Sequence, residues 1–353
     1  MGSMIDLTVT DDLSSTVEQL RRDNPLLDTA TIAALVARQR YRTQGMGPVE
    51  PLFSDPEVGE IMMNGAGEIW VDRGGGPERS GIAITDDELG LLIERILDPL
   101  GLRLDRSSPF VDARMDDGSR VNIIVAPLAL TGPVVTIRRF SEQVLPLGAF
   151  GGLSLQAVLH RLLAERASLL VVGATSSGKT SLLNALAALL DPAERIVTIE
   201  DTAELRLPGR HVVGLEGREA NSEGVGEVTL RSLVRNALRM RPDRLIVGEV
   251  RGPEALDLIM ALNTGHRGSL ATCHAGSSDA GLQRLLALAM LGSVGLPALS
   301  LRQQLGSAID VVVHIERFGA QRLVTEIVAV DDGPELETTP LWTLDPVAPG
   351  GGR

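Results

Sequence analysis

The spacing of apolar residues changes along the chain and divides it into segments. Residues 4–44 are polar with apolar positions at helical spacing, which predicts N-terminal helices. Residues 45–140 carry short apolar runs separated by turn residues, and this pattern predicts a small α+β domain. Residues 141–152 hold one proline and three glycines and predict a linker between domains, because these residues interrupt regular structure.

The longest segment, residues 153–330, alternates between apolar strand patterns and amphipathic helices. That order is typical of a mainly parallel sheet with helices on its faces. The strands are expected at 169–172, 195–199, 244–247 and 268–272, followed by a hairpin over 310–330. Residues 331–353 are rich in proline and glycine and are expected to form a flexible tail. The predicted fold class is therefore α/β, with a smaller α+β domain before it.

A phosphate-binding motif follows the strand expected at 169–172. Residues 173–180 read Gly-Ala-Thr-Ser-Ser-Gly-Lys-Thr and match the pattern G-x-x-x-x-G-K-[ST] in full. In such a loop the glycines let the backbone approach phosphate, Lys179 reaches the terminal phosphates and the Thr180 hydroxyl can ligate Mg²⁺. The sequence therefore predicts that the protein binds ATP and Mg²⁺. The predicted contact residues are Gly173, Ala174, Thr175, Ser176, Ser177, Gly178, Lys179, Thr180 and Ser181.

The use of basic residues singles out Lys179. The chain has 33 basic residues, and Lys179 is the single lysine among them. A composition that uses arginine wherever a positive charge suffices indicates that arginine is chemically unacceptable at this position. An ammonium is a compact point charge that fits inside a phosphate loop, whereas a guanidinium is a broad planar fork.

Composition and charge argue against several classes of protein. The net charge of −13 and the aromatic content of 2% are unfavourable for gripping nucleic acid, since that affinity comes from basic contacts and base stacking. One cysteine, Cys273, excludes an internal disulfide framework and a cysteine-rich zinc module. Residues 1–20 lack the apolar core of a secretory signal. We therefore expect a cytoplasmic protein that makes no direct contact with nucleic acid.

Carboxylates follow two of the expected strands. Glu200, with Glu204 close behind it, ends one strand, and Glu249 ends the next. Ligands bind at the carboxyl ends of strands in open α/β sheets, so all three are candidate catalytic residues. Glu249 is the predicted carboxylate that orients or deprotonates water. Gly248 stands where generic P-loop enzymes place a Mg²⁺-binding aspartate. The metal is therefore expected to bind Thr180, Glu200 and Glu249 instead.

Histidine and arginine supply further candidates, each with an alternative. His274 ends an expected strand and either contacts the γ-phosphate or has a structural role. Arg114, Arg120 and Arg138 fall on adjacent expected strands of the α+β domain, as does Arg139. Such a group of arginines is either a solvated face or a set of cations that reach the nucleotide, and the spacing alone leaves both open.

Four segments resemble the ATPases of type II and type IV secretion systems. They are similar to that family's Walker A motif, Asp box, glycine-containing Walker B motif and His box, in the same order. The segments are 173–180, 199–205, 239–251 and 264–275, and the resemblance covers roughly residues 45–330. The helix that leads into the Walker B strand, 234–243, looks most similar to the Tad (Flp) pilus assembly ATPases. The four-cysteine zinc element of many pilus-extension ATPases is absent from the sequence, which points away from that branch.

The resemblance implies a fold, a complete site and partners. The fold is a C-terminal RecA-like P-loop domain with a smaller, PAS-like N-terminal α+β domain that closes over the nucleotide, assembled as a homohexamer. Arg114, Arg120 and Arg138 then complete the site. Turnover of ATP with Mg²⁺ moves the domains and drives inner-membrane platform proteins that insert or extract pilin. The protein is then cytoplasmic and associates peripherally with the inner membrane through those partners.

The leading hypothesis is an ATP-hydrolysing motor for assembly or retraction of a Tad-type pilus or a related secretion machine. A type IV secretion or conjugation ATPase is the main alternative, because its two-domain layout is similar. A RecA-like nucleic-acid translocase is a further alternative, which the net charge and aromatic content disfavour. An inactive nucleotide-binding scaffold is disfavoured by the intact Lys179, Thr180 and Glu249.

Overall fold

The structure is a computed structural model that describes residues 45–139, 144–207, 209, 211–218, 225–293, 295–319 and 321–345. The helices predicted in residues 4–44 lie outside the described residues. The chain divides into two compact units between Ser141 and Glu142. This division falls at the start of the segment for which the sequence predicts a linker.

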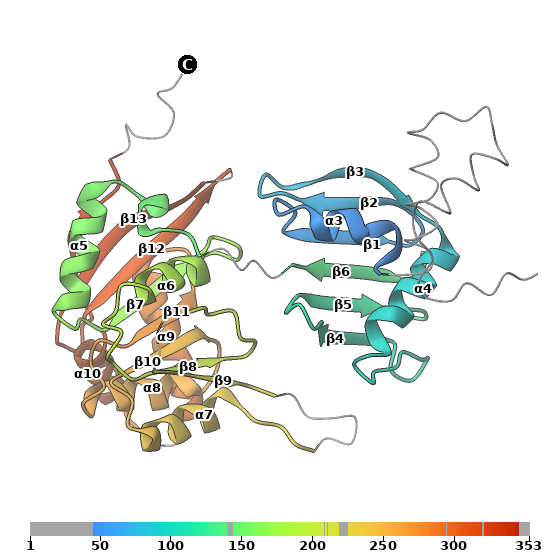
Figure 1. Cartoon of the computed structure of the whole chain (residues 1–353). Helices are drawn as coiled ribbons and strands as arrows, with labels where there is room; N and C mark the ends of the chain where they lie inside the picture. Colours follow the sequence, from blue (N-terminus) through green and yellow to red (C-terminus); the bar gives the residue numbers. More distant parts are fainter. Residues whose placement is uncertain are drawn as a thin grey trace, which may run out of the picture. The chain divides into compact units, whose positions relative to one another are not determined.

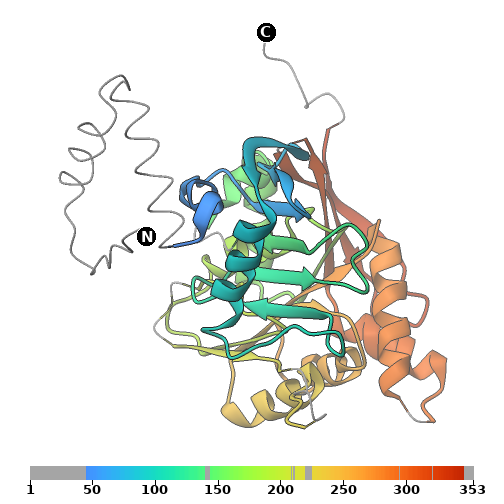
Figure 2. The same ribbon diagram turned by 90° about the vertical axis from the view of Figure 1, so that its right-hand side faces the viewer.

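The N-terminal unit is a six-stranded sheet with the order β3-β2-β1-β6-β5-β4. All neighbouring strands in it are antiparallel. The strands are β1 (Glu60–Asn64), β2 (Gly67–Asp72), β3 (Pro77–Ile84), β4 (Phe110–Arg114), β5 (Arg120–Ile124) and β6 (Val134–Arg138). The short helices η1 (Gly47–Val49) and α3 (Glu50–Ser54) precede the sheet, and helix α4 (Asp86–Leu97) crosses one of its faces (Figures 1 and 2).

Helix α4 closes the core of this unit. It begins with a capping box, in which the Thr85 hydroxyl accepts from the N–H of Glu88 and the Glu88 carboxylate accepts from the N–H of Thr85. Its buried side chains, among them Leu89, Leu92 and Ile96, recur at helical spacing and pack against the sheet. The sheet and this helix confirm the α+β character that the sequence predicts for the segment.

The C-terminal unit is built on an eight-stranded sheet with the order β14-β13-β12-β7-β11-β10-β8-β9. The strands from β12 to β9 run parallel, and β13 and β14 join antiparallel at one edge. The strands are β7 (Leu169–Gly173), β8 (Ile196–Glu200), β9 (Val212–Glu216), β10 (Arg244–Val250), β11 (Leu270–His274), β12 (Val311–Phe318), β13 (Gln321–Val330) and β14 (Thr338–Thr343). All five residues of β7 are buried, as expected for a central strand with helices on both faces.

Helices cover both faces of this sheet (Figure 1). They are α5 (Leu153–Ala164), α6 (Lys179–Ala187), α7 (Leu230–Ala237), α8 (Glu254–Asn263), α9 (Ser278–Gly292) and α10 (Ala298–Ala308), with the short turns η2 (Leu147–Phe150) and η3 (Leu238–Met240). Helices α5 and α6 share a core with Leu169 and Val171, and α8, α9 and α10 share another with Leu170 and Val172. Successive residues of β7 therefore face opposite layers, as in the predicted RecA-like domain.

The segment predicted to be a flexible tail contains a strand. β14 pairs antiparallel with β13 at the edge of the sheet. Trp342 packs against the core, and its indole N–H donates to Ser154 Oγ at 3.2 Å. Pro340 is tolerated because an edge strand leaves one side of its backbone without a partner strand. The prediction of a tail is therefore wrong for the described residues 331–345, where β14 pairs with β13 and the partly buried Trp342 packs on the core.

The apolar stretch 285–301 is divided between two helices. Helix α9 ends at Gly292, and α10 begins at Ala298. Leu285, Leu288 and Leu301 lie in the core between these helices and the sheet. In the part of the chain that the structure describes, no helix combines the length and the apolar character needed to span a membrane.

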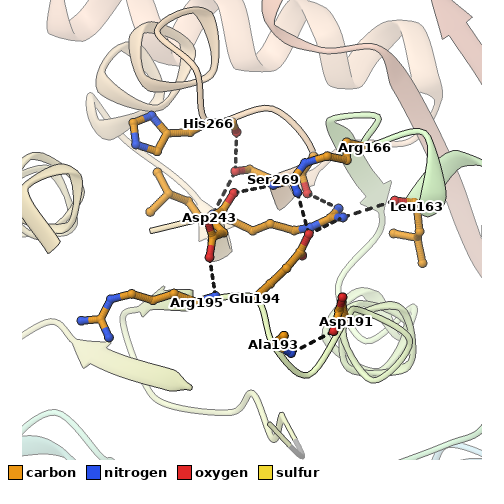
Figure 3. A network of polar contacts seen from close by, with 12 residues as sticks. Leu163, Arg166, Asp191, Ala193, Glu194, Arg195, Asp243, His266 and Ser269 are labelled. Atoms are coloured by element: carbon orange, nitrogen blue, oxygen red, sulfur yellow. Dashed lines mark hydrogen bonds and ion pairs between the residues drawn. The ribbon is translucent and has the colours of Figure 1, made fainter. Parts of the chain in front are cut away.

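A polar network fixes the amino ends of the parallel strands (Figure 3). The buried Arg244, the first residue of β10, forms an ion pair with Glu194 and donates to the carbonyl of Gly268 at 2.9 Å. Arg166 donates to the same Glu194 carboxylate at 2.6 Å. These contacts hold the starts of the strands together. The carboxyl ends lie at the opposite end of the sheet, where ligands bind in folds of this class.

Candidate active site

The phosphate-binding motif forms the loop between β7 and α6. β7 ends at Gly173, and α6 begins at Lys179. A Cβ on Gly173 would lie 2.4 Å from the carbonyl oxygen of Ile315 and 2.5 Å from Ser177 Oγ, so only glycine fits there. Gly178 precedes α6 with a φ of +100°, a conformation that glycine adopts without strain. The backbone of the loop itself therefore requires both glycines of the motif.

Donors for an anion gather on this loop. Lys179 is 9% exposed, and its ammonium donates to the carbonyls of Gly173 and Ala174 at 3.1 and 3.0 Å. The buried Ser177 hydroxyl has no hydrogen-bond partner among the described residues. A buried hydroxyl of this kind is unfavourable unless a ligand satisfies it. Together with the N–H groups at the start of α6, these donors fit the phosphate chain of a nucleotide.

Glu200 is a buried carboxylate at the carboxyl end of β8. Its Oε1 accepts from the N–H groups of Glu204 and Leu205, at 2.9 and 3.0 Å. Burial raises the pKa of Glu200 to about 7, because loss of water disfavours the charged form, while the two backbone donors oppose this shift. The nearby carboxylates of Glu204 and Glu216 also raise the pKa of Glu200. A cation beside Glu200 would therefore favour its ionised form.

The glycine at the Walker B position makes room for Glu200. Strands β8 and β10 are neighbours, and a Cβ on Gly248 would lie 2.8 Å from Cγ of Glu200. A side chain at position 248 and the observed Glu200 side chain cannot share this space. Gly248 on β10 thus leaves space that the Glu200 side chain of the adjacent strand β8 occupies.

Replacement of Gly248 by alanine is expected to displace Glu200 and to lower the free energy of unfolding by about 1–3 kcal/mol, because overpacking forces side chains from their rotamers. Thermal or denaturant unfolding measures the effect. Gly276→Ala is the matched control, since a Cβ at Gly276 has nothing within 4 Å. Equal stability of Gly248→Ala and the wild type would show that Glu200 does not occupy this space.

Glu249 stands next to Gly248 on β10, which continues to Val250, beyond the strand end that the apolar run predicts. Its Oε2 accepts from Arg251 Nη2 at 2.6 Å, and Arg251 Nη1 lies 3.7 Å from Asp201 Oδ2. The hydrogen bond to Glu249 raises the pKa of Arg251. The sequence motifs give Arg251 no role of its own, although its spacing of two from Glu249 favours a shared side of an extended chain.

His274 reaches the phosphate loop from the end of β11. Its exposed ring places Nδ1 3.4 Å from the Thr175 hydroxyl. Thr272 on the same strand donates to the carbonyl of Gly248 at 2.6 Å and ties β11 to β10. Cys273 lies between Thr272 and His274 in the chain. Burial raises the pKa of its thiol to about 11, so this thiol stays protonated at neutral pH. The structure therefore brings His274, but no reactive thiolate, to the loop.

The predicted acidic residues and the phosphate loop share one end of the sheet. Glu200 ends β8, Glu249 is the last residue but one of β10, and the phosphate loop begins where β7 ends. These residues come from the carboxyl ends of neighbouring strands and the loops that follow them. Sequence positions far apart are thus brought to one site, as expected for this class of sheet.

The predicted metal ligands are few in number. Thr180 and Ser181 lie half-buried in the first turn of α6, beside Lys179. Among the residues that the structure describes, no group of three or more histidine, cysteine, aspartate or glutamate side chains could hold a metal ion. Mg²⁺ in nucleotide sites keeps water ligands and binds one or two protein groups together with phosphates, so such a group is not required. Thr180 with Glu200 or Glu249 fits that donor set.

Three predicted arginines form a row across the sheet of the N-terminal unit. Arg114 is paired with Arg120, and Arg120 with Arg138, on the adjacent strands β4, β5 and β6. Directly opposed residues lie on the same face of a sheet. They alternate with the buried Val121 and Ile137, so the arginine row lies on the face away from the core.

Arg139, the next residue, has a different role. Its Nη1 donates to the backbone carbonyls of Leu52 and Val58 at 3.4 and 3.1 Å, and also to that of Asp55. Its guanidinium lies 6.0 Å from the centre of the Phe53 ring. Arg139 therefore holds helix α3 and the following loop against the sheet, and it is a structural residue.

A phosphate loop after β7, in a parallel sheet ordered β12-β7-β11-β10-β8, defines a RecA-like P-loop nucleotide-binding protein. The chain belongs to the family described as "Type II/IV secretion system protein", whose model matches residues 42–335. The resemblance seen in the sequence motifs is thereby confirmed at the level of the superfamily.

Individual relatives extend this comparison. The chain is 37% identical over 332 residues to a candidate conjugal transfer protein of Mycobacterium tuberculosis, covering 90% of this chain and 94% of the relative. It is 34% identical over 312 residues to the type IV secretion system protein PtlH of Bordetella pertussis, covering 79% of this chain and 92% of the relative. The crystal structure of the pilus retraction motor PilT with bound ADP matches with a TM-score of 0.59 at 18% identity. The match covers 80% of this chain and 82% of the PilT chain. This last likeness shows the shared fold.

Proposed function

We propose that this protein is a Mg²⁺-dependent ATPase that acts as a motor of a membrane secretion or pilus machine. The proposal rests on the phosphate loop with its donors Lys179 and Ser177. These lie at the carboxyl ends of the parallel strands, as do Glu249 and Glu200. Such a site positions a triphosphate and a water molecule, as phosphoryl transfer to water requires. Mg²⁺ on Thr180 and the carboxylates would neutralise charge on the β- and γ-phosphates.

Hydrolysis follows from the roles of this chain's own residues. Lys179 and the loop N–H groups hold the β- and γ-phosphates. Glu249 orients the attacking water and takes its proton as the new oxygen–phosphorus bond forms, and the bond to the bridging oxygen breaks with its electron pair leaving on ADP. In this proposal His274, which lies beside Thr175, is the group that contacts the γ-phosphate. Glu204 supports this arrangement through its backbone bond to the Glu200 carboxylate.

The direct test of this proposal is ATP hydrolysis by the purified chain. Phosphate release should require Mg²⁺, and it should not rise when DNA or RNA is added. Mass measurement in the presence of nucleotide should show a homohexamer. A chain that binds ATP but releases no phosphate under any of these conditions would instead be the inactive scaffold.

The arginine row leads to a prediction that separates binding from turnover. We infer from the family resemblance that Arg114, Arg120 and Arg138 complete the site, so Arg120→Ala should lower kcat about 100-fold and leave ATP affinity within about threefold. ATPase rates and nucleotide titrations measure both. Arg139→Ala is the comparison variant, because its contacts stabilise its own unit, and it should lower the melting temperature instead. An unchanged ATPase rate in Arg120→Ala would indicate that the arginine row is a solvated face with no role in hydrolysis.

The machine that this motor serves is proposed to be a Tad-type pilus. The helix and turn over 234–243, which lead into the Walker B strand, support that assignment through their likeness to Tad pilus ATPases. In this proposal the N-terminal unit closes over nucleotide within the hexamer, and the resulting movement drives inner-membrane platform proteins. The protein then works in the cytoplasm, at the inner membrane, through those partners.

A type IV secretion or conjugation machine is the second candidate. The names of the relatives from Mycobacterium tuberculosis and Bordetella pertussis favour it. Deletion of the gene in its own host separates the two candidates. Loss of surface pilin with normal DNA transfer and protein secretion supports the pilus, whereas the reverse result supports the second candidate. A Lys179→Arg allele should reproduce the phenotype of the deletion.

A further inference from the structure

We propose that Arg322, on strand β13, binds the α- or β-phosphate of the nucleotide. The inference rests on the proposed function and deepens it, because it adds a cation to the same site. Arg322 lies outside all four secretion-ATPase motifs, the last of which ends at residue 275.

The side chain of Arg322 runs across the phosphate loop. A Cβ on Gly178, the residue before Lys179, would lie 2.5 Å from Arg322 Cδ, 3.2 Å from its Cγ and 3.4 Å from its Cβ. The stem of the arginine therefore packs on the N-terminal cap of α6. Because Nε follows Cδ directly, the guanidinium begins one bond beyond this contact, at the end of the helix where anions bind.

The strand order places β13, which carries Arg322, and the strands of the candidate catalytic residues on opposite sides of β7. β12 and β13 lie on one side of β7, and β11, β10 and β8 lie on the other. Glu200, Glu249 and His274, the candidates for the γ-phosphate and its water, all come from the second side. In the proposed function the γ-phosphate lies toward those groups, which leaves the side of β13 for the α- and β-phosphates. The turn η2 contacts both α6 and β13 and closes this side of the loop.

The chemistry of an arginine suits this position. A guanidinium makes paired, charge-assisted hydrogen bonds to phosphate oxygens. Lys179 sits inside the loop, where a compact ammonium is needed, whereas the side chain of Arg322 approaches the loop from β13. Its charge contacts the part that ATP and ADP share, so it should hold both nucleotides equally.

Arg322→Met tests the inference, because methionine keeps an unbranched stem over Gly178 and removes the charge. The Kd values for ADP, ATP and pyrophosphate, measured by calorimetry with Mg²⁺, should all rise about tenfold or more. The KM for ATP should rise by a factor similar to that of these Kd values, as expected for a group that holds the nucleotide. Adenosine, used as a competitor, should bind the variant and the wild type alike.

Arg302→Met is the matched control. Arg302 has similar exposure, and its guanidinium donates to the backbone carbonyls of Pro334 and Glu335. Removal of its charge should leave all three Kd values within about twofold. Melting temperatures without nucleotide establish that each variant folds, and Arg322→Gln, with the same expected losses, replaces the methionine variant if that one does not.

Three results would overturn the inference. Unchanged ADP and pyrophosphate affinities would show that Arg322 only covers Gly178. Weaker binding of adenosine with unchanged pyrophosphate affinity would assign Arg322 to the base. A selective loss of kcat would place it at the γ-phosphate. Failure of the wild type itself to bind ADP would instead refute the proposed function, so the two failures are distinguishable.

Discussion

Lys179→Arg is expected to abolish ATP hydrolysis, with kcat reduced about a thousandfold or more. The substitution keeps the charge, so the expected loss comes from the shape of the cation. The ammonium of Lys179 is enclosed by its own loop, with the carbonyls of Gly173 and Ala174 at 3.1 and 3.0 Å. A planar guanidinium is broader and cannot occupy that space unless the loop moves, and the loop N–H groups would then lose their alignment with the phosphates.

Steady-state phosphate release and ADP titration measure the result for Lys179→Arg. The control is the reverse exchange at an exposed helical position, Arg161→Lys on α5, which should leave the rate unchanged because its charge lies in solvent. A Lys179→Arg variant that retains more than about a tenth of the wild-type rate would show that any cation serves. The single lysine of the chain would then be an accident of composition.

The parts of the site that the sequence predicts correctly are local ones. The strand β7, the phosphate loop and helix α6 follow from an apolar run and a motif whose spacing determines its own backbone conformation. The placement of Arg114, Arg120 and Arg138 on adjacent strands was also predictable, because strands that follow one another in the chain commonly lie side by side. The part that these three arginines take in hydrolysis stays a prediction.

Contacts between strands that are distant in sequence could not be predicted. The space that Gly248 leaves for Glu200 exists only because β8 lies beside β10, and strand order is not written in either segment. The same holds for Arg322, which reaches Gly178 from a strand much later in the chain. Residues that act through tertiary neighbours carry no motif, and for this reason the sequence gives no sign of them.

Glu249→Gln is the second variant with a large expected effect. It should keep ATP affinity within about threefold and lower kcat about 100- to 10,000-fold, because glutamine has the size of glutamate but cannot take a proton from water. ATP affinity should persist, since the donors that hold the phosphates, Lys179 and the loop, are unchanged. The variant should also lose the ion pair between Glu249 and Arg251. In the wild type, Arg251 Nη1 also lies 3.7 Å from Asp201 Oδ2.

That lost ion pair requires a control for charge, because removal of any carboxylate next to an arginine changes the local field. Glu165→Gln removes a carboxylate that lies 4.0 Å from Arg161 on the surface of α5, and it should hydrolyse ATP at the wild-type rate. Single-turnover experiments then separate the two explanations for Glu249→Gln. If Glu249 handles the water, bound ATP should persist unhydrolysed for many wild-type turnover times. Rapid hydrolysis of bound ATP with slow release of ADP would instead assign Glu249 and Arg251 to the opening of the site, and another group would have to activate the water.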